Sequence, residues 1–256
     1  MSYKFYVTLP MRCSSNPAER LNEILLRAKD FGKKDLTVSD MWADVFEIDR
    51  EDKSRILSCI ANVIMLTENV KKDIEGLRKG NRDSLVRGIL KLQHIFIRMD
   101  LSAKPGSFIN QIDELMLNTV EGCSLVLDVA FDYKQLEQEQ LDTVKVKINN
   151  IIQQVLDSVI PDEMKNFIVL RLNEIDFAII NYKISGLEGL KAAINKCAGE
   201  IFLDDTICRE VNKNNEKVKV IVEKVLSILR NINTVVTFSC NTIPIMSKRI
   251  TDIFLK

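Results

Sequence analysis

Apolar residues recur along most of the chain at steps of three and four, the spacing of one face of an α-helix. The clearest example lies between residues 49 and 78, where a heptad seam runs through Ile56, Ile60, Val63, Thr67, Val70, Ile74 and Leu77. Nine glycines and five prolines are too few for the frequent turns of a sandwich or a barrel. The pattern therefore predicts an all-α fold, a bundle of about eight to ten amphipathic helices that are mostly antiparallel.

Capping and turn residues divide this pattern into separate helices. Asn16 and Pro17 are typical of a helix start and predict a first helix that ends at about Phe31. Further helices are expected at about 39–48, 49–78, 81–100, 107–133, 135–159, 161–184, 187–202, 215–238 and 242–254. Residues 204–215 are polar and predict a loop or a single helical turn.

Two of these helices have apolar faces that predict where they pack. The helix at 107–133 is expected to bury one face, formed by Phe108, Ile112, Leu115, Thr119, Val126 and Ala130. The helix at 161–184 is apolar on two nearly opposite sides. A helix of that kind is expected at the centre of its bundle.

Residues 3–9 alternate between apolar and polar positions, which predicts a short extended N-terminal segment. It would lie as an arm on the core or add a strand to a partner's sheet. The length of 256 residues suits one large helical domain or two smaller ones, and we expect a single domain over 1–256. The best break is the proline-glycine turn at 102–107, so a division would give the parts 1–103 and 107–256.

Composition narrows the class of protein. Lys plus Arg and Asp plus Glu number 36 each, and this balance argues against a dedicated nucleic-acid binder. Neither a signal peptide nor an uninterrupted apolar run of ~20 residues is present, so we expect a cytoplasmic protein with no membrane partner. Six scattered cysteines and one histidine favour reduced thiols over a disulfide framework or a zinc site. No metal and no cofactor are expected.

The single histidine, His94, follows Arg87 by seven residues on the helix at 81–100. At about 100° per residue the two side chains share one face, and Lys91 and Arg98 join them in a basic stripe on the outside. The spacing resembles the Arg-x4–6-His motif of the HEPN ribonucleases, which are small all-α domains. That resemblance covers eight residues and implies that Arg87 and His94 act together on an RNA phosphodiester across a dimer. Gly88 departs from the family pattern, which commonly has a polar residue there.

The turn that follows the helix at 161–184 is the second candidate. Gly186 is suited to a positive φ that ends one helix, Ser185 to capping the next, and Gly189 to a close backbone approach. Arg171 and Glu174 are three residues apart and could pair with each other. Two interpretations stay open: a helical hairpin with a buried polar tether, or a recognition patch for a partner that uses Arg171, Glu174 and Tyr182.

No catalytic motif beyond Arg87 and His94 appears, so the leading hypothesis is a non-enzymatic protein–protein interaction or regulatory module. It would bind a protein partner or associate with itself, also through Lys91 and Arg98, in a bacterial toxin–immunity or phage-defence system. The alternative is a HEPN-like ribonuclease that uses Arg87 and His94. A third hypothesis is a bundle with a ligand cavity around Arg171.

Overall fold

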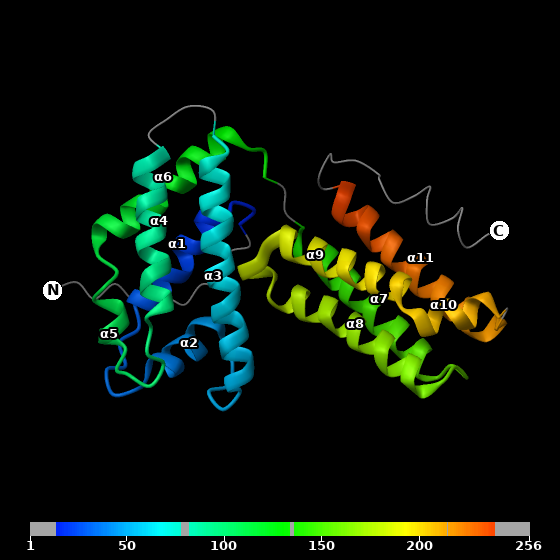
Figure 1. Ribbon diagram of the computed structural model, residues 1–256. Helices are drawn as coiled ribbons and strands as arrows, with labels where there is room; N and C mark the ends of the chain where they lie inside the picture. The colour runs from blue at the N-terminus through cyan, green and yellow to red at the C-terminus, as the bar shows by residue number, and fades with distance from the viewer. Residues whose placement is uncertain (1–13, 78–81, 134–135, 214, 239–256) are drawn as a thin grey trace. The chain divides into compact units, whose positions relative to one another are not determined.

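We analysed a computed structural model of the chain, which describes residues 14–77, 82–133, 136–213 and 215–238 (Figure 1). The described residues contain eleven helices and no strand, which confirms the all-α prediction. The expected extended segment at 3–9 and the expected helix at 242–254 lie outside the described residues. In chain order the helices are α1 (Pro17–Lys29), α2 (Val38–Phe46), α3 (Lys53–Glu75), α4 (Arg82–Ile97), α5 (Gly106–Ile109), α6 (Glu114–Ala130), α7 (Gln138–Leu156), α8 (Asp162–Ile180), α9 (Tyr182–Leu203), α10 (Asp205–Asn212) and α11 (Glu216–Phe238).

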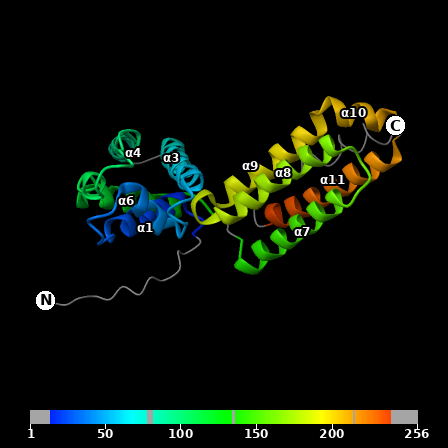
Figure 2. The ribbon, with the colours of Figure 1, turned by 90° about the horizontal axis from the view of Figure 1, so that it is seen from below.

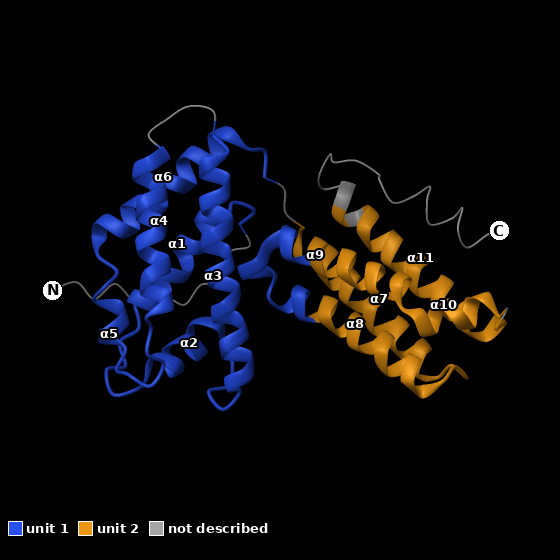
Figure 3. Ribbon diagram, viewed as in Figure 1, with its two compact units in different colours: residues 1–135, 177–190 blue, residues 136–176, 191–256 orange. Residues whose placement is uncertain are grey.

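The chain forms two compact units, and each consists of two stretches of sequence (Figure 3). Unit 1 comprises residues 1–135 and 177–190, and unit 2 comprises residues 136–176 and 191–256. The turn at 102–107, where the sequence has its best break, lies inside unit 1. Its backbone is tied to α2, because Val38 donates to the carbonyl of Ala103 and Ser39 donates to that of Leu101, both at 2.9 Å.

Helices α1, α3, α4 and α6 build unit 1, each in contact with its neighbour in a closed ring. The heptad seam of α3 is buried along its whole length, as the sequence predicts. At one end α2 adds Trp42, which is fully buried and packs against Phe46, Phe96 and Phe108 at ring-centroid distances of 5.2, 5.8 and 5.3 Å. Aromatic packing thus joins α2, α4 and α5 in one core.

Asn16 begins α1 and also holds α6. Its Oδ1 accepts a hydrogen bond from the backbone N–H of Ala18 at 2.9 Å, as the predicted helix cap requires. Its Nδ2 donates to the carbonyl of Ser124 at 2.9 Å and to Oδ1 of Asp128 at 2.7 Å. Because Asn16 is only 1% exposed, these bonds are sheltered from competing water and orient α6 against α1.

The expected helix at 107–133 is in fact two helices, and the buried face predicted for it is wrong beyond residue 113. Residues 110–113 are not helical, and Asp113 starts α6 by accepting from the N–H of Met116 at 2.7 Å. The interruption shifts the helical phase, so α6 buries a different set: Met116, Val120, Cys123, Ser124 and Leu127. Three residues assigned to the core are consequently exposed: Leu115, Val126 and Ala130.

Unit 2 contains α7, α10, α11 and most of α8 and α9, and its four long helices run side by side (Figures 1 and 2). The prediction that the helix at 161–184 is central is wrong. It buries one face, through Met164, Ile168, Leu172 and Ile175. Leu170 and Ile180, on the second apolar side, are 55% and 41% exposed, because helices in a small bundle bury one stripe each.

The polar stretch at 204–215 forms a helix rather than a loop. Asp204 caps it by accepting from the N–H groups of Thr206 and Ile207 at 3.0 and 2.8 Å. Ile207 is the residue of α10 that is buried. A cap together with one apolar anchor is thus enough to extend an expected single turn into the helix Asp205–Asn212.

Helix α4 lies close to α6 at Gly88, and this contact generates a stability prediction. A Cβ at Gly88 would lie 2.4 Å from Cγ2 of Thr119, so we expect Gly88→Ala to destabilise unit 1 by about 1–2 kcal/mol. Gly122→Ala is the matched control, because its new Cβ would meet Leu85 at an ordinary 3.8 Å. Adding Thr119→Ser to the Gly88→Ala variant removes Cγ2 and should restore most of the lost stability. Chemical denaturation measures the free energy of unfolding of each variant. Equal stability of the Gly88 and Gly122 variants would contradict this packing.

Candidate interaction surfaces

The outer face of α4 carries the basic stripe that the sequence predicts. Arg87, Lys91 and His94 are exposed, and so is Arg98, which directly follows the helix. The opposite face of α4 is buried through Ile89, Leu92 and Phe96. None of the four basic side chains takes part in a salt bridge within the described part of the chain, so their charges face solvent.

The outer face of α6 is apolar, and this surface was missed by sequence reasoning. Its members, which we call the α6 stripe, are Leu115, Leu125, Val126 and Val129, with exposed fractions of 71, 64, 39 and 90%. On a helix that turns about 100° per residue they fall within an arc of about 100°, together with Asn118 and Gly122. No charged residue lies in that arc. The sequence signal was present, but Leu115 and Val126 had been assigned to the core.

One edge of the α6 stripe is acidic. Glu114, Glu121 and Asp128 follow one another at intervals of seven residues and are all exposed. On the helix each of them lies directly beside a member of the stripe's arc, at the position that flanks an apolar seam in coiled coils. The outer face of α6 thus has an apolar surface with a row of carboxylates along one side.

The turn after α8 is a hairpin fixed by buried polar groups. Gly186 has φ 63°, which confirms the predicted positive φ. A Cβ at Gly189 would lie 2.4 Å from that of Ser185, which is a side-chain neighbour, so the close backbone approach expected at Gly189 stays a prediction. The hydroxyl of Ser185 donates back to the carbonyl of Asn181 at 3.1 Å, and the cap expected of Ser185 stays a prediction. Tyr182 is 3% exposed and belongs to unit 1, whereas Arg171 and Glu174 belong to unit 2.

Arg20 of α1 holds this hairpin, and sequence reasoning missed it. Its guanidinium donates to the carbonyls of Ser14, Ser15 and Ile184 at 2.9, 2.8 and 3.2 Å. It lies so close to Gly186 that a Cβ there would be 2.6 Å from the guanidinium carbon. Burial lowers the pKa of Arg20, and the nearby carboxylate of Glu188 counteracts part of that effect. A buried cation thus fastens residues 177–190 to unit 1.

Arg171 and Glu174 pair as the sequence predicts, within a larger ion network of unit 2. Arg171 pairs through Nη1 with Glu174 and through Nε with Glu200, each at 2.5 Å. Lys196 lies 2.8 Å from the other oxygen of Glu174, and the guanidinium of Arg171 is 5.2 Å from the ring centre of Phe167. These contacts join α8 to α9 and occupy Arg171 within the unit. Of the three residues of the expected recognition patch, Tyr182 is buried, and Arg171 and Glu174 pair with each other.

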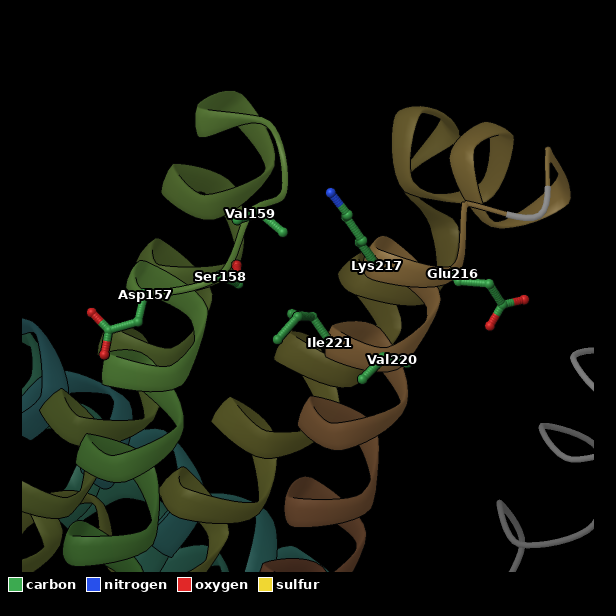
Figure 4. A pocket seen from close by; sticks show the side chains of 7 residues that line it. All are labelled: Asp157, Ser158, Val159, Glu216, Lys217, Val220 and Ile221. Atoms are coloured by element: carbon green, nitrogen blue, oxygen red, sulfur yellow. The ribbon is translucent and has the colours of Figure 1, made fainter.

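Unit 2 also has a surface depression of about 420 Å³ between the turn after α7 and the start of α11 (Figure 4). Val159, Val220 and Ile221 provide its apolar lining, and the side chains of Asp157 and Glu216 point away from it. The carboxylates thus do not converge on the depression, and it offers no arrangement for acid–base chemistry.

The buried thiols are not nucleophiles. Burial raises the pKa of Cys59 to about 11 and the pKa values of Cys123 and Cys197 to about 12, so these thiols stay protonated at neutral pH. Across the described ranges, no group of three His, Cys, Asp or Glu residues is placed to hold a metal ion. None of the helices in these ranges is long and apolar enough to cross a membrane.

Comparison with known proteins adds no relative. No protein-family model, curated protein or solved structure matches this chain. Its function is therefore inferred from its surfaces, and we base the inference on the α6 stripe and on the basic stripe of α4.

The ion network generates a pH prediction. Burial raises the pKa of Glu174, but Lys196 and Arg171 outweigh it and hold the pKa below its ordinary value of 4.5. A carboxyl with a lowered pKa stabilises the folded state above that value, and the stabilisation is lost as the pH falls. We expect Glu174→Gln to cost about 1 kcal/mol at pH 7 and to flatten the acid loss of stability. Glu223→Gln, at an exposed position of α11, is the control and should leave the profile unchanged.

Chemical denaturation between pH 7 and pH 3 measures both effects. If the free energy of unfolding depends on pH in the same way in wild type and in Glu174→Gln, the ion network does not stabilise the folded state as we expect.

Proposed function

We propose that this protein is a non-enzymatic, cytoplasmic protein–protein interaction or regulatory module of a bacterial toxin–immunity or phage-defence system. It binds a protein partner, which includes a second copy of itself, through the outer face of α6. The observation that carries the proposal is the exposure of the α6 stripe on a helix whose opposite face is already buried in the core.

Hydration physics supports this assignment. Single exposed apolar side chains are ordinary on a protein surface, whereas several on one face mark a contact site. Burying apolar area is worth about 25 cal/mol per Å², so full burial of one Leu or Val side chain contributes about 1.5–3 kcal/mol. Leu115, Leu125 and Val129 provide the apolar centre that such an interface needs. The acidic edge formed by Glu114, Glu121 and Asp128 then selects a partner with a basic contact surface.

Photo-crosslinking in the native cell tests the proposal. A benzophenone amino acid at position 125 should give one defined protein adduct, because the side chain would lie in the interface. The matched control is position 57 on α3, where Leu57 is 52% exposed and Leu125 is 64% exposed. Adding Val129→Glu should reduce the adduct at position 125 by about tenfold, since a charge buried against apolar side chains costs more than ~1.4 kcal/mol.

Adduct patterns that are identical at positions 125 and 57 would contradict the proposal. So would an adduct that persists unchanged with Val129→Glu. The identity of the adduct and the genes beside this one test the proposed setting in immunity or defence.

A second candidate function rests on α4. Arg87 and His94 are exposed on one face, the arrangement that the HEPN-like ribonuclease hypothesis requires. In that case His94→Ala and Arg87→Ala would each abolish RNA cleavage while the fold stays intact. Arg98→Ala is the matched control, because Arg98 belongs to the same basic stripe but lies outside the motif.

Purified wild-type protein and the three variants would be assayed on a mixed-sequence single-stranded RNA. Cleavage that is equal in wild type and His94→Ala, or cleavage absent from wild type, would eliminate the ribonuclease hypothesis. Circular dichroism of each variant controls for folding.

A further inference from the structure

We infer that the α6 stripe binds the outer face of α4 in a second copy of this chain, and that the two copies form a two-fold symmetric dimer. The inference rests on the proposed function and names the partner of the same surface. It is argued from the charges and the exposed apolar residues of α4 and α6.

The acidic edge of the α6 stripe defines what it can bind. Glu114, Glu121 and Asp128 flank the stripe on one side, so a complementary helix needs apolar residues at heptad spacing with cations beside them. From Arg87 to Arg98 the outer face of α4 has this composition, whereas Asp83, one heptad before Leu90, is an exposed acid on the same face. Leu90 and Ile97, seven residues apart, are 39% and 70% exposed. The cations beside them form the basic stripe Arg87, Lys91, His94 and Arg98.

The two faces cannot meet within one copy. In unit 1, α4 and α6 already contact each other at Gly88 and Thr119, where Gly88 leaves no room for a Cβ. Both helices bury their inner faces in the same core, through Ile89 and Leu92 on α4 and through Leu127 on α6. Their outer faces therefore point away from that core, and the complementary surfaces can pair only between two copies.

Pairing of two α6 stripes is disfavoured by charge. About a two-fold axis across the helices, Glu121 would face Glu121 of the other copy, and Glu114 would face Asp128. Like charges placed opposite one another across an interface repel and disfavour that pairing. Pairing α6 with α4 instead sets three carboxylates against Arg87, Lys91 and Arg98.

The arrangement closes on itself. When α6 of one copy binds α4 of the second, the two-fold axis also places α4 of the first on α6 of the second. Two equivalent helix pairs then form, so each copy buries both of its outer faces. The interface is isologous and limits assembly to a dimer.

A charge-swap experiment tests the inference with the full chain. One variant, Glu114→Lys with Glu121→Lys, makes the edge of the α6 stripe basic. The other, Lys91→Glu with Arg98→Glu, makes the α4 face acidic. All four positions are exposed, and Asp128 is left unchanged because it binds Asn16.

Sedimentation velocity over a concentration series should show a wild-type dimer and two variants whose dissociation constants are raised at least about tenfold. An equimolar mixture of the two variants should recover a one-to-one dimer, because both helix pairs then have opposite charges. A single chain with all four substitutions should dimerise like wild type.

Raised salt should weaken the wild-type dimer. Circular dichroism confirms folding, and Leu125→Gln, which leaves every charge in place, should also weaken the dimer.

Wild-type protein that stays monomeric at every concentration would overturn the inference, and so would variants that dimerise as wild type does. Failure of the proposed function is distinguishable from this. If the protein is a monomer and position 125 crosslinks a different protein in the cell, the proposed interaction module stands and the inference that its partner is a second copy is wrong. A mixture of ¹⁴N- and ¹⁵N-labelled protein separates crosslinks within one molecule from crosslinks between two copies. Crosslinks from position 125 that form only within one molecule would overturn both proposals.

Discussion

The rotation of α6 about its own axis depends on one buried amide. Asn16 uses its oxygen to cap α1 and its nitrogen to hold the carbonyl of Ser124 and the carboxylate of Asp128. Breaking such a buried hydrogen bond costs about 1–3 kcal/mol, so α6 is held in one orientation. In that orientation Ser124 and Leu127 face the core, and Leu125 and Val129 face solvent. The position of the α6 stripe therefore follows from Asn16, the residue that caps α1.

The same orientation separates charge on the surface of unit 1. Helix α6 presents carboxylates beside its apolar face, and the neighbouring α4 presents cations beside Leu90 and Ile97. The chain as a whole is neutral, with 36 residues of each sign, so the separation is local and cannot be read from composition. Complementary faces on adjacent helices of one unit are what a self-associating module needs.

How far the sequence predicts this structure depends on the range of each interaction. The helices, the cap at Asn16, the positive φ at Gly186 and the Arg171–Glu174 pair follow from residues within a few positions of one another. The buried face of α6 was mispredicted because the break at 110–113 shifts the helical phase, and which of its two apolar faces is buried depends on contacts with residues far away in sequence, such as Asn16. Arg20 could not be predicted either, since its partner Ile184 lies 164 residues away.

The central claim is that the α6 stripe binds a second copy of this chain, and hydroxyl-radical footprinting of the stripe tests it most directly. Purified chain would be labelled in dilute and in concentrated solution, and oxidation would be quantified residue by residue. The account predicts that Leu115 and Leu125 become protected as concentration rises, while Leu57 on α3 stays equally reactive. Oxidation of Leu115 and Leu125 that is independent of concentration would contradict the pairing of α6 with a second copy.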